Sequence, residues 1–329
     1  MKEWTDPDNC LLASSIFGTD HVREVEDLIL TWAARHGFDH CRVDTIEISI
    51  GAAVTISSPN RQRIVVKVWP GTADVPALAA QMKLQKEMAS RNFPAPRVLT
   101  ELSPLGPGWA IGMEFNRSGV LTDVRLPGVR FAMAAGLARF VALGEAYRNL
   151  DGLPRRLVPP EGRIWPPPHN ALFDFGATVH GAEWIDDIAQ HFLPILRSAK
   201  SKVVVGHCDW SAKNMRMGPD GLAMLYDWDS VFIDHEALIV GSAAAQFPVN
   251  WELDVPQTPT NGEVAAFIRD YEATRHALFA PRECSEIEAS VTYARAYKAR
   301  CEHALDPDAE WWSGSARESL KNNGPFALP

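Results

Sequence analysis

One stretch, residues 203–230, constrains this chain more than any other. It reads VVVGHCDWSAKNMRMGPDGLAMLYDWDS, with short apolar runs on both sides of a Gly-Pro-Asp-Gly turn. Two short β segments around such a turn are typical of a hairpin. A hairpin brings its two ends side by side. We therefore expect Asp209 and Asn214, which precede the turn, to lie close to Asp227, which follows it.

Two carboxylates and one carboxamide oxygen in a small volume suit one kind of chemistry. Oxygen ligands without a thiolate favour Mg²⁺, which takes one or two carboxylates and completes its shell with phosphate oxygens and water. A further carboxylate beside the metal can accept a hydroxyl proton. The alternative is a polar turn between two core strands, but burying these groups without a ligand would be costly.

Composition narrows the class of partner. The chain has 329 residues, enough for two lobes, and 46% hydrophobic with 22% charged residues is ordinary for a globular protein. Its formal net charge of −9 argues against nucleic acid or an anionic membrane as partner. The same charge favours a cationic small molecule over an anionic one.

Targeting signals and cysteines indicate the compartment. The start, MKEWTDPDNC, does not resemble a signal peptide, and the sequence contains no apolar run of membrane-spanning length. The five cysteines are scattered and form no CxxC pair. This pattern is typical of reduced thiols rather than of a disulfide framework or a zinc site, so we expect a cytoplasmic protein.

The N-terminal third reads as a small antiparallel sheet with helices. Residues 1–18 are expected to be a loose lead-in. The apolar pattern predicts helices over 20–36 and 74–91, the second with Asp74 as N-cap. It predicts strands over 41–50, 53–57, 63–69, 97–102 and 109–115. Lys67 is the only charge inside the third strand, and by itself it is equally typical of an edge residue or of one that extends its ammonium into solvent.

The remainder is mainly helical. Helices are predicted over 127–147, 182–199 and 236–245, the last with Asp234 as N-cap. Capping boxes at Thr260-x-x-Glu263 and Ser285-x-x-Glu288 predict two more helix starts. Residues 153–181 are rich in proline and aromatic side chains and predict a long irregular segment.

The motif at 203–230 resembles the catalytic segment of the protein-kinase-like superfamily. His207-Cys208-Asp209 with Asn214 is similar to an H-x-D-x-x-x-x-N loop, and Asp227-Trp228-Asp229 is similar to the metal-binding end of the following strand. The match is closest to the aminoglycoside phosphotransferase family. It covers the chain from about residue 41 to the last helices and implies an α+β, two-lobed fold. The implied lobes are a nucleotide-binding one at 1–115, with the 20–36 helix, and a catalytic and acceptor-binding one at 116–329.

The resemblance implies a role for each motif residue. Asp209 would orient the acceptor hydroxyl and take its proton, while Asn214 and Asp227 would hold Mg²⁺ on the phosphates of ATP in the cleft between the lobes. His207 would keep the loop in shape, and Asp229 would help either the metal or the loop. Lys213 would either contact the γ-phosphate or face solvent. The implied reaction is transfer of a phosphoryl group from ATP to a hydroxyl of a small molecule.

The nucleotide side of the resemblance is less regular. Lys67 would contact the phosphates, but the position of its usual glutamate partner falls on Gln81; Glu87 is about 9 Å further along the helix axis. Residues 113–116 would form the hinge, where the backbone at Glu114 and Asn116 would contact adenine. The turn at 49–53 would cover the phosphates without a GxGxxG motif, as is common in this family, and the sequence has no P-loop.

The sequence leaves the identity of the acceptor and the residues that bind it undetermined. The segment 153–181 is either a packed surface loop or a wall of the acceptor site built from Trp165, His169, Phe173 and Phe175. Loops near the C-terminus carry acidic residues that are individually typical of solvated surface: Glu252, Asp254, Asp306, Asp308 and Glu310. Two rivals remain, a nucleotide-binding module without activity and a protein kinase, although the sequence shows no HRD, DFG or APE motif.

Overall fold

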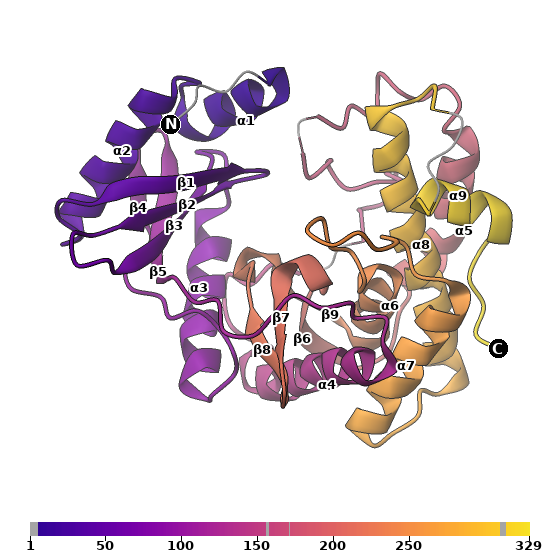
Figure 1. Ribbon diagram of the computed structural model, residues 1–329. Helices are drawn as coiled ribbons and strands as arrows, with labels where there is room; N and C mark the ends of the chain where they lie inside the picture. Colours follow the sequence, from indigo (N-terminus) through magenta and orange to yellow (C-terminus); the bar gives the residue numbers. More distant parts are fainter. Residues whose placement is uncertain (1–5, 156–157, 171, 310–313) are drawn as a thin grey trace. The chain divides into compact units, whose positions relative to one another are not determined.

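The computed structural model describes residues 6–155, 158–170, 172–309 and 314–329. The chain divides into two compact units, shown in Figure 1. The first contains residues 1–116 and 169–172, and the second contains residues 117–168 and 173–329. Within the described ranges, no helix combines the length and apolar character that a membrane crossing requires.

The first unit is built on one antiparallel sheet. Its strands follow the order β1-β2-β3-β5-β4, and each neighbouring pair is antiparallel. The strands are β1 (Arg42–Ile48), β2 (Ala52–Ser57), β3 (Arg63–Trp69), β4 (Ser103–Leu105) and β5 (Gly108–Glu114). The predicted strands over 41–50, 53–57, 63–69 and 109–115 are confirmed. The prediction over 97–102 is wrong: Val98 makes an isolated bridge to Met113, and the edge strand β4 starts only at Ser103.

Two helices cover one face of this sheet, α1 (Pro7–Phe17) and α2 (Val22–Arg35). Ile16, Ile29 and Trp32 from the helices pack against Val54 and Val66 from the strands in one buried cluster. The prediction of a loose lead-in is therefore wrong for the described residues from Pro7 onward. Asp6 caps α1 by accepting a hydrogen bond from the Asp8 amide, and Gly18, with a φ of 77°, ends it.

The alternation of side chains along β3 determines on which face of the sheet Lys67 lies. Side chains of successive strand residues point to opposite faces, so Lys67 lies on the face opposite to its neighbours Val66 and Val68. Those two valines belong to the core beneath α1 and α2. Lys67 therefore points away from that core, beside its strand partners Ala53 and Ile111.

The third helix of this unit, α3 (Val75–Ser90), begins as predicted. Asp74 accepts a hydrogen bond of 3.1 Å from the Ala77 amide, and Pro76 occupies the first turn. Gln81 and Gln85 lie on the buried side of the helix. A capping aspartate ahead of a proline is a local signal, and this explains why the start of α3 was predictable.

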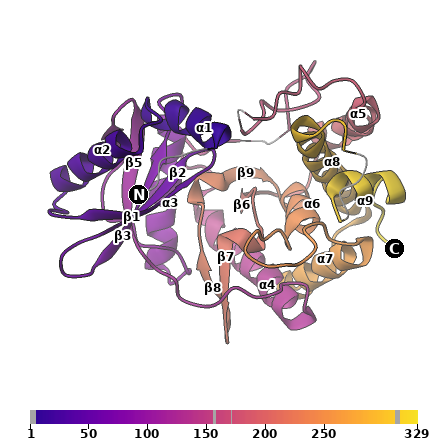
Figure 2. The same ribbon diagram turned by 45° about the horizontal axis from the view of Figure 1, so that its top comes forward.

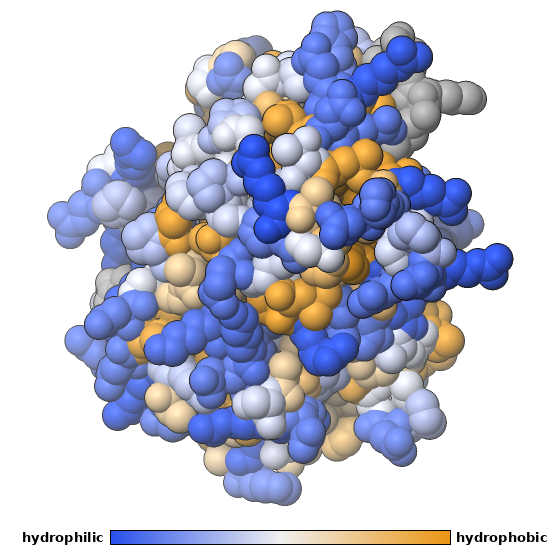
Figure 3. Space-filling model, turned by 90° about the vertical axis from the view of Figure 1, so that its left-hand side faces the viewer, coloured by the Kyte–Doolittle hydropathy of each residue, from blue (hydrophilic) through white to orange (hydrophobic). Residues whose placement is uncertain are grey.

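The surface seen from the left-hand side of Figure 1 is mixed. Figure 3 shows several apolar patches separated by hydrophilic side chains. Apolar groups contribute more than half of the accessible surface of ordinary folded proteins, so scattered patches of this kind need no ligand to explain them.

The second unit contains two short antiparallel sheets. Strands β6 (Val203–His207) and β9 (Val231–His235) form one sheet, and β7 (Met215–Gly218) and β8 (Gly221–Leu225) form the other. A hairpin does form around the Gly-Pro-Asp-Gly turn, with Met215 paired to Leu225 and Gly218 to Gly221. Its first strand is β7, however, whereas the apolar run Val203–Val205 that was expected to flank the turn belongs to β6 and pairs with β9.

Helices make up most of this unit, and they are listed here with their bounds: α4 (Pro127–Gly144), α5 (Glu183–Arg197), α6 (Glu236–Gln246), α7 (Asn261–Arg275), α8 (Pro281–Leu305) and α9 (Ala316–Asn323). Helices α5, α8 and α9 lie side by side in Figures 1 and 2, and their apolar residues share one buried cluster. Short 3-10 turns occur at Glu145–Tyr147, Ala212–Asn214 and Trp228–Ser230.

Two predicted helix starts need correction. The residue before α6 is His235, and the Asp234 carboxylate accepts a hydrogen bond from the His235 amide instead of capping the helix. Helix α8 starts at Pro281, where Glu283 accepts from the Ala280 amide, so the Ser285 motif lies inside the helix. The capping box of Thr260 and Glu263 at the start of α7 is confirmed.

Candidate active site

The motif is enclosed by one strand pair. His207 at the end of β6 pairs with Val231 at the start of β9, and the Cys208 amide donates to the Ser230 carbonyl at 2.8 Å. Residues 208–230 therefore leave and return at one place. The Tyr226 amide also donates to the Asn214 carbonyl at 2.8 Å, which extends the β7–β8 pairing up to the residue before Asp227. The hairpin thus places the backbone of Asn214 and of residues 226–227 together.

The carboxylate of Asp209 is held on both oxygens. Ser211 donates its hydroxyl to Oδ1 at 2.8 Å, and the Lys213 ammonium lies 2.7 Å from Oδ2. The side chain remains partly exposed, so a bound molecule could reach it. An ionised carboxylate with a fixed direction and an open approach is what a general base requires. The ammonium of Lys213 is paired with Asp209 in this structure, and its contact with the γ-phosphate stays a prediction.

Asn214 is anchored through its nitrogen. Its side-chain Nδ2 donates to the Asp209 carbonyl at 3.0 Å, and the residue is buried. Within the described parts of the chain, no hydrogen bond to the carboxamide oxygen of Asn214 is found. The bond to nitrogen determines which end of the amide points away from the Asp209 backbone. That oxygen is therefore directed by the loop and remains available as a ligand.

Asp227 has an unusual backbone. Its φ and ψ are 61° and 47°, in the left-handed region that a non-glycine residue rarely adopts. The next residues form a 3-10 turn, and Ser230 donates its amide to the Asp227 carbonyl and its hydroxyl to Asp227 Oδ2, both at 3.0 Å. Asp229 lies in the same turn with a half-buried side chain. The strained conformation turns the chain sharply at the end of β8 and directs the Asp227 carboxylate.

His207 is enclosed by aromatic rings. It is 1% exposed and makes edge contacts with Phe140 and Trp210, at centroid distances of 6.4 and 6.0 Å. Burial lowers the pKa of the imidazole below its ordinary value, against the opposing charges of Asp209 and Asp227. Neither ring nitrogen has a hydrogen-bond partner of normal geometry among the described residues. The ring therefore acts as packing beneath the loop and is not exposed to a substrate.

The donor set fits a small hard cation. Asn214 and Asp227 supply oxygen atoms, which are the ligands that Mg²⁺ prefers. The described chain contains no cluster of three or more His, Cys, Asp or Glu side chains that could hold a metal. A cation at this position would thus take two side chains and complete its shell with phosphate oxygens and water, as Mg²⁺ usually does in phosphoryl-transfer enzymes.

In the first unit, Lys67 and Gln81 are the predicted phosphate-side residues. Lys67 lies in the middle of β3, and its ammonium is 5.9 Å from the ring centroid of Trp69. Gln81 is 3% exposed on the buried side of α3, whereas Glu87 is half-buried nearer the end of the helix. That Gln81 is the partner of Lys67 stays a prediction.

The turn before β2 approaches the sheet closely. A side chain at Gly51 would place its Cβ 2.5 Å from the Val68 carbonyl, so only glycine fits there. The Ser49 amide donates to the Gly51 carbonyl at 2.7 Å and closes the turn. This is the turn that the sequence predicts to cover the phosphates, and its backbone is held tightly even without a glycine-rich motif.

The predicted hinge lies at the end of β5. Arg97 donates to Glu114 at 2.7 Å and Asn116 donates to it at 3.3 Å. Burial acts to raise the pKa of the Glu114 carboxyl, but the contacts with Arg97 and Asn116 outweigh it and leave the pKa below its usual value. The Glu114 amide donates to the Arg97 carbonyl at 2.9 Å. An adenine contact would thus use the other backbone groups of Glu114 and Asn116.

Two of the aromatic residues in the segment 153–181, Trp165 and Phe175, are packed side chains. Trp165 donates its ring N–H to Asp186 at 2.7 Å and packs on Tyr293 and Phe175 at centroid distances of 5.3 and 6.1 Å. These contacts make Trp165 and Phe175 part of the packing against α5 and α8, which favours the packed-loop interpretation for them. His169 belongs to the short stretch grouped with the first unit. Of the acidic residues considered for the acceptor, Glu310 lies outside the described residues.

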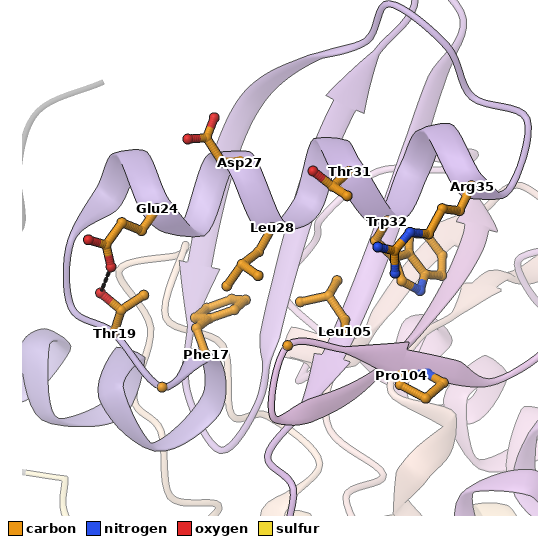
Figure 4. Close-up of a pocket in the computed structure, with 12 residues that line it drawn as sticks. Phe17, Thr19, Glu24, Asp27, Leu28, Thr31, Trp32, Arg35, Pro104 and Leu105 are labelled. Atoms are coloured by element: carbon orange, nitrogen blue, oxygen red, sulfur yellow. Dashed lines mark hydrogen bonds between the residues drawn. The ribbon is translucent and has the colours of Figure 1, made fainter.

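Two surface hollows lie elsewhere. One of about 660 Å³ is in the first unit, where Phe17, Leu28 and Leu105 point into the space between α1, α2 and the β4–β5 turn, as Figure 4 shows. Glu24, which accepts the Thr19 hydroxyl, stands on its rim. The other, of about 270 Å³, lies between the start of α7 and α9. Neither is lined by a predicted site residue, so the chemistry of the motif, and not the size of a hollow, identifies the candidate site.

The sequence reading missed the residues that support the loop. Ser211 orients Asp209, Gln246 donates its side chain to the Cys208 carbonyl, and the Ala212 amide donates to the Phe247 carbonyl at 2.9 Å. Ser211 was predictable, because a hydroxyl two residues after an aspartate often bonds locally. Gln246 and Phe247 were not, because they reach the motif only through the packing of α6.

Known structures share this fold. The amicoumacin kinase hAmiN in complex with AMP-PNP, Ca²⁺ and Ami aligns with a TM-score of 0.68 at 10% identity, over 93% of this chain and 97% of that one. The structure described as a putative aminoglycoside phosphotransferase from Ralstonia eutropha aligns with a TM-score of 0.55 at 14% identity, over 91% and 94%. The microcompartment-associated aminopropanol kinase aligns with a TM-score of 0.57 at 12% identity, over 90% and 98%.

The likeness to known proteins is found at the level of structure and not of sequence. No protein-family model matches the chain, and no curated protein sequence matches it. At identities of 10–16%, the structural likeness establishes the fold. The predicted α+β, protein-kinase-like architecture with a mainly helical C-terminal part is confirmed, and it is the fold of phosphotransferases that act on small molecules.

Proposed function

We propose that this protein is an ATP-dependent phosphotransferase that moves the γ-phosphate to a hydroxyl group of a small molecule. One observation carries the proposal. A single closed loop holds the Asp209 carboxylate by two contacts, directs the Asn214 oxygen through its amide nitrogen, and turns sharply at Asp227. The fold supports the same conclusion, because proteins of this architecture include small-molecule kinases.

Each residue has a proposed task. Asp209 orients the acceptor hydroxyl and accepts its proton, while Asn214 and Asp227 hold Mg²⁺. When bound, the cation neutralises charge on the phosphates. Lys67 contacts the phosphates with Gln81 as its neutral partner, and the backbone at Glu114 and Asn116 binds the adenine. Phosphoryl transfer depends mainly on positioning and charge stabilisation, so these tasks are sufficient for the reaction.

The ion pair of Lys213 with Asp209 adds a feature to this scheme. The ammonium lies 2.7 Å from the proposed base, so it is placed to interact with any phosphoryl group that approaches the acceptor oxygen. Two tasks follow for Lys213: it keeps the carboxylate oriented before the substrate binds, and it supplies positive charge where negative charge develops.

The acceptor is proposed to be a polyhydroxylated or amine-bearing small molecule. A net charge of −9 attracts cations and disfavours anions. Solved structures with this fold include an aminopropanol kinase and an ethanolamine kinase, and both are named for amino alcohols. The proposal covers antibiotics and metabolites alike.

A screen for ADP release tests the proposal. The panels are aminoglycosides, neutral sugars with amino alcohols, and proteins, each with ATP and Mg²⁺. Turnover on a member of the first two panels is expected. Activity confined to proteins would overturn the small-molecule assignment. ATP binding without turnover on any panel would support the rival, a nucleotide-binding module, which the replacement of glutamate by Gln81 favours.

A further inference from the structure

The segment that follows α6 supports the Asp209 loop. The Phe247 carbonyl accepts from the Ala212 amide, and the Val249 carbonyl accepts from the Lys213 amide at 2.8 Å. Val249 is therefore in direct contact with the residue whose ammonium pairs with Asp209. The chain then leaves this contact into the loop 250–257, which contains neither helix nor strand.

The loop 250–257 is closed by one side chain. The Gln257 carboxamide accepts from the Asn250 amide at 2.6 Å and donates to the Asn250 carbonyl at 2.7 Å. It also donates to the Val255 carbonyl at 2.7 Å. Gln257 thus pairs with Asn250 as a neighbouring strand would. Its own carbonyl accepts from Lys298 on α8 at 3.2 Å, so both ends of the loop are fixed to the body of the unit.

Trp251 is the first residue beyond this contact. It is 69% exposed, although burying a large aromatic side chain usually stabilises a protein. Trp251 lies two positions after Val249, so their Cα atoms are at most about 7 Å apart. Glu252 and Asp254 are exposed on the same loop. The loop closed by Gln257 thus presents an indole together with two carboxylates.

The backbone places this loop beside the motif. Val249, whose carbonyl accepts from the Lys213 amide, directly precedes the first residue of the loop. The Lys213 ammonium in turn lies 2.7 Å from the Asp209 carboxylate. An acceptor whose hydroxyl reaches Asp209 would therefore have the loop 250–257 beside its remaining atoms.

We propose that Trp251 contacts the acceptor, stacking on a sugar ring or an organic ammonium group, and that Gln257 is the positioning residue that keeps the indole in place. This inference rests on the proposed phosphotransferase function. Aromatic faces attract organic cations, and the attraction increases when water is excluded. Glu252 supplies the opposite charge for an amine, which makes amino sugars and amino alcohols the acceptor class.

The test uses the full-length protein and two probes, kanamycin and glucosamine. Binding of each is measured by calorimetry in the presence of AMP-PNP and Mg²⁺, and ADP release is measured with ATP. Trp251→Ala is expected to weaken binding of at least one probe by tenfold or more, with the ATP KM unchanged, and Trp251→Phe is expected to restore most of it. Leu278→Ala is the control, because Leu278 is 80% exposed in the loop between α7 and α8.

Gln257→Ala tests the positioning role. It is expected to weaken probe binding as Trp251→Ala does, and the double variant should lose no more than either single one. Additive losses would mean that Gln257 acts independently of Trp251 and would overturn its role. Probe binding that is absent in the native protein, or unchanged in Trp251→Ala, would overturn the inference. Trp251-dependent binding without ADP release would overturn the phosphotransferase function alone.

Discussion

Replacing Asp209 by asparagine separates catalysis from stability in this protein. Asparagine keeps the shape of the side chain, and its oxygen can still accept from the Ser211 hydroxyl, now 2.8 Å from Oδ1. It cannot accept the acceptor proton, and it cannot form the ion pair with Lys213. General-base assistance contributes about 10²–10⁴-fold to a rate. At 1.36 kcal/mol per factor of ten, the activation free energy should rise by about 3–5 kcal/mol.

The stability change should be much smaller. The paired side chains of Lys213 and Asp209 are 33% and 22% exposed, and an ion pair that water still reaches contributes at most about 1 kcal/mol. That loss would lower the melting temperature by only about 2–4 °C in a protein of this size class. Turnover should therefore fall by at least a factor of a hundred while the fold and the ATP affinity stay close to those of the native protein.

Three measurements on the same preparation decide the matter: ADP release with an acceptor found in the screen, ATP binding, and thermal unfolding. Asp220→Asn is the matched control, since Asp220 is an exposed carboxylate in the β7–β8 turn. If Asp209→Asn retains turnover within tenfold of the native value, Asp209 is not the base. If it unfolds at a temperature more than about 5 °C lower, the ion-pair estimate is wrong and the residue is structural as well.

Three further outcomes are expected. Asp227→Gly should abolish the Mg²⁺ dependence of ATP affinity. It should change the free energy of unfolding by less than about 1 kcal/mol, because relief of the left-handed backbone offsets the lost Ser230 bond. If ATP titrations with and without Mg²⁺ show that the dependence persists, the metal assignment is wrong. Gln81→Leu should raise the ATP KM while Gln81→Glu should not, and an unchanged KM in both would remove Gln81 from the phosphate side. Burial raises the pKa of the Cys301 thiol to about 12, so its thiolate fraction at pH 8 is about 10⁻⁴. Because the unfolded thiol ionises near pH 9, the free energy of unfolding should fall as the pH rises above about 9. Labelling of Cys301 by a thiol reagent as fast in the native as in the unfolded protein would be the contrary result.

Local signals determined how much of the fold was predictable. Asp74 ahead of Pro76 gave the start of α3, and alternation along 63–69 gave β3 with Lys67 at its centre. Where a pattern had competing explanations, prediction failed. Residues 97–102 are extended and apolar enough for a strand, but after Pro94 and Pro96 the chain crosses the sheet edge with only one bridge. The serine of the Ser285 motif lies inside α8 and bonds to the Pro281 carbonyl, since Pro281 starts the helix earlier.

In the candidate site, too, local patterns were predictable and contacts from distant segments were not. The spacing of Asp209, Asn214 and Asp227 around a hairpin was sufficient to expect their proximity. What spacing could not provide was the support from distant segments: the Phe247 and Val249 carbonyls reach the loop only because α6 packs beneath it. Gly206 permits this, because a side chain there would meet Ile239 of α6 at 2.3 Å. A contact of that kind depends on tertiary packing and leaves no periodic pattern in the sequence.

The pairing of β6 with β9 has a consequence for how the protein folds. The proposed base and both proposed metal ligands lie within residues 208–230, a loop closed by the His207–Val231 pair. Contacts between residues close in sequence form early, because closing a short loop costs little chain entropy. We therefore expect the catalytic loop to be structured in the folding transition state, with φ-values near 0.5–0.8 for β6 and β9. Truncating Val205 or Ile233 should then slow folding more than it speeds unfolding, so that the two strands that bound the loop are paired before α6 packs beneath it.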